Sequence, residues 1–136
     1  FSLVGGLQAA LIALALIVFQ VILHELIHGA VFWLVTRARP TFGFKGLYAY
    51  AGLPDWYLPR NEFLVAALAP LIVITAVGTL LLAVVPAGWI PGLLLVIVSN
   101  AAGSVGDMMA AVWLLSKPNS TMVNDTGDAL TIFLPG

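Results

Sequence analysis

The chain has 136 residues, of which 62% are hydrophobic and 8% are charged, and its formal net charge at pH 7 is -1. Because a soluble domain carries about 25% charged residues, this composition excludes an ordinary soluble globule and indicates one integral membrane domain, residues 1–136, in a lipid bilayer. The small net charge excludes a nucleic-acid partner, and the absence of cysteine excludes disulfides and thiolate metal ligands.

Three apolar stretches are long enough to cross a bilayer, which takes about 20 residues of helix. We predict transmembrane helices over approximately residues 7–36, 63–85 and 91–116, joined by a loop of residues 37–62 and followed by a tail of residues 117–136. Pro70 falls inside the second stretch, and membrane helices tolerate such a proline with a kink. The predicted fold class is therefore all-α, with three membrane-spanning helices.

The loop after the first stretch contains the segment TFGFKGLYAY, residues 41–50. Its aromatic residues alternate with a period of two around Gly46, which predicts a small β-hairpin-like interfacial loop. Two roles remain open for it: an aromatic anchor at the membrane surface, or an edge strand, Phe42–Tyr50, that holds an extended peptide. In the tail, residues 124–128 are typical of a tight turn and residues 130–133 of a short strand.

The basic residues predict an orientation. Four of the five lie in the loop, and the fifth, Lys117, follows the third stretch. The positive-inside rule then places the loop and the C-terminus in the cytoplasm and the N-terminus outside. The first and third helices consequently run in the same direction.

The first stretch contains His24, Glu25 and His28, which form the pattern H-E-x-x-H. Histidines four residues apart on a helix project from one face and can share a metal ion, and the adjacent glutamate can reach a metal-bound water. Ionisable residues are costly in hydrocarbon, so they indicate function. The alternative is a polar network that holds helices together.

A catalytic zinc has three protein ligands and one open position. Asp107 is the only carboxylate within the third stretch, where Asn100, Ser104 and Asp107 share one helical face. His28 lies nine residues before Arg37, and Asp107 lies ten before Lys117, so both are roughly 14 Å from the cytoplasmic boundary. Because the two helices run in parallel, we expect these groups to meet.

The segments HELIHG and SNAAGSVGDMMA resemble the membrane zincin peptidases related to site-2 proteases. The resemblance implies that His24, His28 and Asp107 bind Zn²⁺, that Glu25 is the catalytic base and that Asn100 is an active-site hydrogen-bonding residue. It also implies a prokaryotic plasma membrane. Site-2 proteases typically have Asn-x-x-Pro leading to Leu-Asp-Gly, whereas this chain has Gly103 in place of the proline and Gly-Asp-Met in place of the second element.

We therefore expect an intramembrane zinc metalloprotease that hydrolyses peptide bonds of membrane-associated or membrane-embedded substrates. The alternative is a non-catalytic membrane metal-binding or scaffold protein, or a metal transporter. Three other enzyme classes fit less well. An aspartyl protease needs a second intramembrane aspartate, a rhomboid-like dyad of Ser104 and a histidine leaves Glu25 without a role, and a di-iron bundle needs a second E-x-x-H.

Overall fold

The computed structural model describes residues 3–46 and 48–134. Its helices are α1 (Leu3–Thr36), α2 (Arg60–Leu82), the short 3-10 helix η1 (Ala87–Trp89), α3 (Ile90–Gly103) and α4 (Val105–Leu115). Its strands are β1 (Thr41–Lys45), β2 (Tyr48–Gly52), β3 (Leu58–Pro59), β4 (Met122–Asp125) and β5 (Leu130–Phe133).

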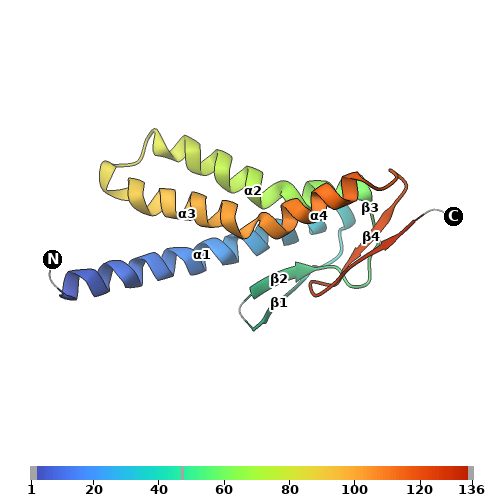
Figure 1. Ribbon diagram of the computed structural model, residues 1–136, viewed down its shortest axis with the longest axis horizontal. Helices are drawn as coiled ribbons and strands as arrows, with labels where there is room; N and C mark the ends of the chain where they lie inside the picture. The colour runs from blue at the N-terminus through green and yellow to red at the C-terminus, as the bar shows by residue number, and fades with distance from the viewer. Residues whose placement is uncertain (1–2, 47, 135–136) are drawn as a thin grey trace.

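The helices lie side by side along the long axis of the molecule, and the strands gather at one end, beside α4 and the C-terminal part of α1 (Figure 1). Two single helices, α1 and α2, are long and apolar enough to cross a membrane. The third predicted helix, residues 91–116, is not continuous: α3 and α4 are bent by 41° where they meet. A third membrane span would therefore have to consist of α3 and α4 together, with a bend between them.

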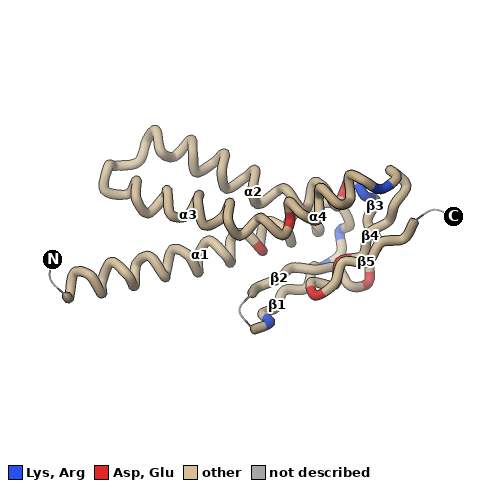
Figure 2. The backbone as a smooth tube through the Cα atoms, in the orientation of Figure 1, with Lys and Arg blue, Asp and Glu red and all other residues tan. Residues whose placement is uncertain are grey.

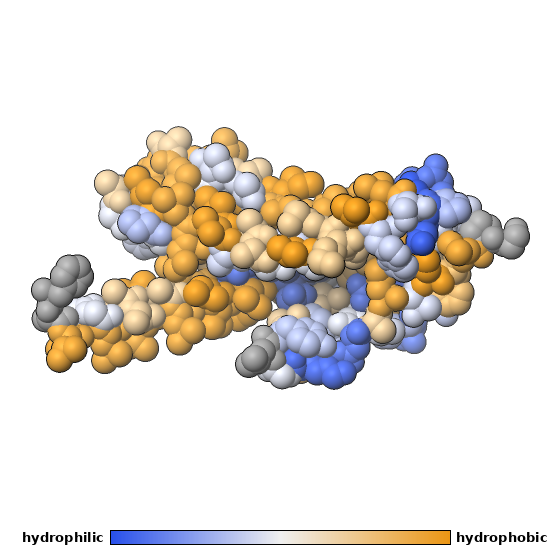
Figure 3. Space-filling view, in the orientation of Figure 1, coloured by the Kyte–Doolittle hydropathy of each residue, from blue (hydrophilic) through white to orange (hydrophobic). Residues whose placement is uncertain are grey.

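The charged residues are confined to the strand-bearing part of the molecule and to the middle of the helices (Figure 2). Residues 1–24 and 63–106 contain no Lys, Arg, Asp or Glu. The surface of this charge-free part is largely hydrophobic, whereas hydrophilic groups cluster around the strands (Figure 3). Exposed apolar side chains without charges are what a hydrocarbon environment requires.

The predicted hairpin forms. Strands β1 and β2 pair antiparallel, with Phe42 opposite Ala51 and Lys45 opposite Tyr48. Gly46 begins the turn in the left-handed region at φ 62°, which glycine adopts without a side-chain clash.

The all-α expectation is wrong, because a second sheet with strand order β3-β4-β5 joins the loop to the tail. The predicted tail strand is β5, and its neighbour β4 pairs with the two-residue strand β3, placing Leu58 opposite Val123. A two-residue strand containing Pro59 has no recognisable pattern, and its partner lies far along the chain. This pairing therefore depends on tertiary packing.

The helix ends also differ from those predicted. α1 already includes residues 3–6, α2 begins at Arg60 after the N-cap Pro59, and α2 ends at Leu82. After Leu82, backbone N–H groups of residues 83–85 donate to the carbonyls of Leu80 and Leu81, which tightens the chain into a turn before Pro86.

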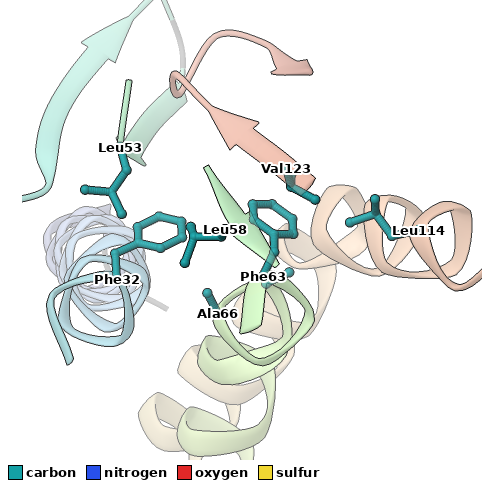
Figure 4. Packing of buried hydrophobic residues seen from close by; sticks show 8 residues of the cluster. Phe32, Leu53, Leu58, Phe63, Ala66, Leu114 and Val123 are labelled. Carbon is teal, nitrogen blue, oxygen red and sulfur yellow. The ribbon is translucent and has the colours of Figure 1, made fainter. Parts of the chain in front are cut away.

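The buried hydrophobic cluster lies where the helices meet the strands (Figure 4). It contains Phe32, Leu53, Leu58, Phe63, Ala66, Ala67, Leu114 and Val123. These residues come from α1, α2, α4 and both sheet regions, so the cluster fixes the strands against the helix ends. The site described next lies beside it, because His28 stacks on Phe32 with ring centroids 6.5 Å apart.

Candidate metal centre

Helix α1 presents His24 and His28 one turn apart on its buried face. Their side chains come within hydrogen-bonding distance, with 3.1 Å between the two Nε2 atoms, and their rings meet edge to face. Both residues are buried, at 7% and 8% exposure. Because the two histidines are four residues apart on one helix, a nitrogen of each ring points towards the same place.

Asp107 reaches the same point from the first turn of α4. Its Oδ2 is 3.1 Å from the His24 Nε2, and its Oδ1 is 3.5 Å from the His28 Nε2. The break between α3 and α4 supports this position, since the Ser104 hydroxyl donates to the Asn100 carbonyl at 2.9 Å and α4 begins anew at Val105. Because Asp107 lies at the start of α4, the helix dipole also favours its carboxylate form.

The second nitrogen of each histidine ring points away from this convergence. The His24 Nδ1 lies 3.0 Å from the Asn100 Oδ1, and the His28 Nδ1 lies 2.9 Å from the Ala66 carbonyl oxygen. Both partners are acceptors, so each ring donates through Nδ1, and the neutral form of each ring then has an unprotonated Nε2. Outer hydrogen bonds of this kind fix the orientation of metal-binding histidines.

The donor set fits a metal ion. Two nitrogen lone pairs and a carboxylate converge, and this arrangement is repulsive unless a cation lies between them. Neighbouring ligands of a tetrahedral zinc, each about 2.0–2.1 Å from the ion, lie roughly 3.3 Å apart. The His24 Nε2 lies 3.1 Å from the His28 Nε2 and 3.1 Å from the Asp107 Oδ2, close to this spacing, and one ligand atom from each of the three residues can be chosen so that all lie within 4.8 Å of one another.

Asn100 lies behind His24, away from the open side of the centre. Its side chain is fully buried, its Oδ1 also accepts from the Gln20 Nε2 at 3.2 Å, and its Nδ2 donates to the Pro70 carbonyl at 3.3 Å. In this structure Asn100 therefore orients the His24 ring. A catalytic role for it remains a prediction.

A cleft of 460 Å³ opens beside the centre. Glu25, His28 and Asp107 line it on the helix side, the β2 backbone forms a second wall, and the β4–β5 turn forms a third. Glu25 and Ala51 both line this cleft. Glu25 is thus next to the ligands without being one of them.

The β4–β5 turn is hydrogen-bonded to the β1–β2 hairpin and to Leu53, which follows β2. The Leu53 N–H donates to the Asp125 carbonyl at 2.7 Å, and Asp128 accepts from the Lys45 ammonium at 2.8 Å and from the Tyr48 hydroxyl at 3.2 Å. The hydrogen bond from Lys45, together with its positive charge, holds the pKa of the Asp128 carboxyl below its usual value. The tail thereby closes one side of the cleft.

Asp125 faces the same cleft from this turn. Burial raises the pKa of its carboxyl, and the Gly127 N–H, which donates to it at 2.7 Å, opposes the rise. Asp125 is therefore a further carboxyl that lines the cleft together with Glu25 and Asp107.

One helix carries H-E-x-x-H, a carboxylate from another helix meets the two histidines, and a cleft lies beside the glutamate. This is the arrangement of a zincin metallopeptidase. A protein-family model described as "Putative zincin peptidase" matches residues 17–122, and the chain belongs to this family. The family implies zinc as the cofactor. No curated protein and no solved structure matched the chain.

The structure brings His24, His28 and Asp107 together as the parallel-helix argument predicts, and their roles as ligands remain predictions. Two residues near the site were not singled out by the sequence. Gln20 lies one turn before His24, and a polar residue at that spacing in an apolar helix is a readable signal. Asp125 carried no such signal, because only the sheet pairing places it at the cleft.

Proposed function

We propose that the protein is an intramembrane zinc metalloprotease of the site-2-protease kind, acting on membrane-associated or membrane-embedded proteins or peptides. The observation that carries the proposal is the convergence of His24, His28 and Asp107 at the edge of a cleft that Glu25 also lines. A scaffold or transport function would need no carboxylate at that place.

The residues around the cleft have distinct tasks in this proposal. A zinc ion held by His24, His28 and Asp107 would supply Lewis acidity that polarises a peptide carbonyl and acidifies water. Glu25 accepts the proton of the attacking water and passes it to the amine as the peptide bond breaks. The buried helix faces around the centre keep bulk water away from the charges.

The β2 strand supports a way to hold the substrate. Among the described strands β2 pairs only with β1, so its other edge faces the cleft. The Leu53 N–H points to the tail turn on that same edge, and the two-residue alternation of a strand places the amides of Ala49 and Ala51 there as well. An extended peptide added along this edge would lie with its backbone beside Glu25.

Cleavage of fluorescently labelled casein by the full chain in detergent, together with its zinc content by elemental mass spectrometry, tests the proposal. Casein offers many extended peptide bonds, so it suits an enzyme of unknown sequence preference. We expect about one zinc per chain, and cleavage that Glu25→Gln abolishes without loss of zinc. The matched control Glu62→Gln changes an exposed carboxylate at the start of α2 and should cleave normally. Zinc binding with equal cleavage in both variants would refute the role of Glu25, and zinc binding without any cleavage would favour the scaffold.

A further inference from the structure

Pro70 lies in the interior of α2, where proline is ordinarily unfavourable. Proline has no backbone N–H, so the carbonyl four residues earlier in the helix loses its usual partner. In α2 that carbonyl belongs to Ala66. Ala66 is 1% exposed, and a buried carbonyl without a partner is costly, so another donor is required.

The donor that meets the Ala66 carbonyl is His28. Its Nδ1 lies 2.9 Å from the carbonyl oxygen. Because a carbonyl can only accept, Nδ1 must carry a proton, and in the neutral ring the His28 Nε2 then holds a lone pair directed towards His24 and Asp107. The bond that α2 lacks internally is thus made by a residue of the metal centre.

The same turn of α2 also acts on the other histidine. The Pro70 carbonyl accepts from the Asn100 Nδ2 at 3.3 Å, which fixes the direction of the Asn100 amide. The Asn100 Oδ1 is then presented to the His24 Nδ1 at 3.0 Å. One helical turn, Ala66 to Pro70, therefore supplies both the carbonyl that accepts from His28 and the carbonyl that orients Asn100 behind His24.

We infer that Pro70 is a positioning residue of the metal centre. Because proline has no backbone N–H, the Ala66 carbonyl remains available as the acceptor for His28. The inference rests on the proposed function and assigns Pro70 a task beyond bending the helix. It predicts a selective effect: restoring an N–H at position 70 should disturb His28 and leave His24 unchanged, because the carbonyl of residue 70 remains.

The chain has only two histidines, so ¹⁵N-histidine labelling gives an NMR spectrum of two rings. In metal-free wild-type protein we expect both rings to be protonated at Nδ1. In Pro70→Ala the new N–H competes for the Ala66 carbonyl, and the His28 signal should shift towards a mixture of tautomers. Zinc affinity should fall about 10-fold, the lower end for an outer-shell change, because a carbonyl has two lone pairs and can be shared.

Two variants separate the effect of the missing N–H at position 70 from other effects of the proline ring. Pro91→Ala makes the same change in the first turn of α3, where no helical N–H partner is needed, and should alter neither signal. Lactic acid at position 70, introduced as an ester-forming analogue of alanine, lacks both the ring and the N–H and should restore the wild-type His28 signal.

Several results would overturn the inference: an unchanged His28 tautomer in folded Pro70→Ala, an ester variant that behaves like Pro70→Ala, or wild-type His28 protonated at Nε2. The last is read from wild-type protein alone and does not depend on the folding of a variant. If wild-type protein binds no zinc while the His28 signal responds as expected, the inference holds and the proposed function fails.

Discussion

The Nε2 atoms of His24 and His28 lie 3.1 Å apart, and in the neutral rings both Nε2 atoms hold a lone pair, because both Nδ1 atoms are engaged with acceptors. Two lone pairs at this distance repel each other, and the Asp107 carboxylate beside them adds a third acceptor. Folding of α1 against α2 and α3 thus builds a site whose favourable state contains a cation. The predictions below follow from this relationship and from the cleft next to it.

Zinc should stabilise the folded protein. A ligand that binds only the native state at about 100 times its dissociation constant adds about 2.7 kcal/mol. Thermal unfolding in detergent should shift upwards with zinc and downwards with a chelator, and Asp107→Ala should lose most of this response. Asp128→Ala removes an exposed carboxylate from the same cleft and should keep it. An Asp107→Ala protein with the full zinc response would move the third ligand elsewhere.

Asn100→Ala should weaken metal binding, because Asn100 orients the His24 ring through its Nδ1. It leaves the His24 Nδ1 and the Gln20 Nε2 without their buried acceptor, which costs about 1–3 kcal/mol for each unsatisfied group, and it should lower zinc affinity about 10- to 100-fold. Chemical denaturation and zinc titration measure these effects, with exposed Asn61→Ala as control. Unchanged zinc affinity with lost cleavage would instead assign Asn100 to the substrate.

Ala49→Pro tests the free edge of β2. Proline removes one outward N–H of this edge and is tolerated on edge strands, so the β1–β2 pairing should survive. We expect the KM for casein to rise with zinc content unchanged. Tyr50→Pro removes an N–H that faces β1 and should disrupt the hairpin itself. Normal KM in Ala49→Pro would argue against strand addition at this edge.

Asp125 should make stability depend on pH. Its pKa is raised in the folded state by burial, so its contribution to the free energy of unfolding is fully present below the unfolded value and is lost as the pH rises through the folded pKa. Asp125→Asn keeps an oxygen for the Gly127 N–H and removes the titration. The variant should therefore gain stability relative to wild type as the pH rises from 4 to 7. A constant difference over this range would contradict the prediction.

The orientation can be tested because the chain has no cysteine. Single cysteines at exposed positions, Leu3→Cys near the N-terminus and Ser120→Cys in the tail, report which side each occupies. In intact bacterial cells expressing the protein, a membrane-impermeant maleimide should label Leu3→Cys and spare Ser120→Cys until the membrane is opened. The reverse pattern would invert the proposed topology.

Local patterns carried most of what could be predicted from the sequence. The H-E-x-x-H spacing needs only helical geometry, the hairpin needs alternation and Gly46, and the meeting of His28 with Asp107 needs only two parallel helices at matching depth. These features depend on neighbours within a few residues or on the thickness of a bilayer.

What the sequence did not predict depends on contacts between distant segments. The break at Ser104 is the local exception: the Ser104 hydroxyl donates to the Asn100 carbonyl four residues earlier, in a stretch whose high mean hydropathy gives no sign of a break. The β3–β4 pairing brings Leu58 to Val123, and only that pairing places Asp125 at the cleft. Such partners become visible only when the core is assembled.

The distance along the chain between His24 and Asp107, 83 residues, has a consequence for biosynthesis. The first helix and its two histidines are synthesised well before the carboxylate that completes their coordination, and the tail turn that walls the cleft follows later still. Until Asp107 has been synthesised, a nascent chain carries only the two histidines of the proposed metal site. In the proposed metalloprotease, the centre can therefore become complete only after Asp107 has been synthesised and α4 has packed beside α1.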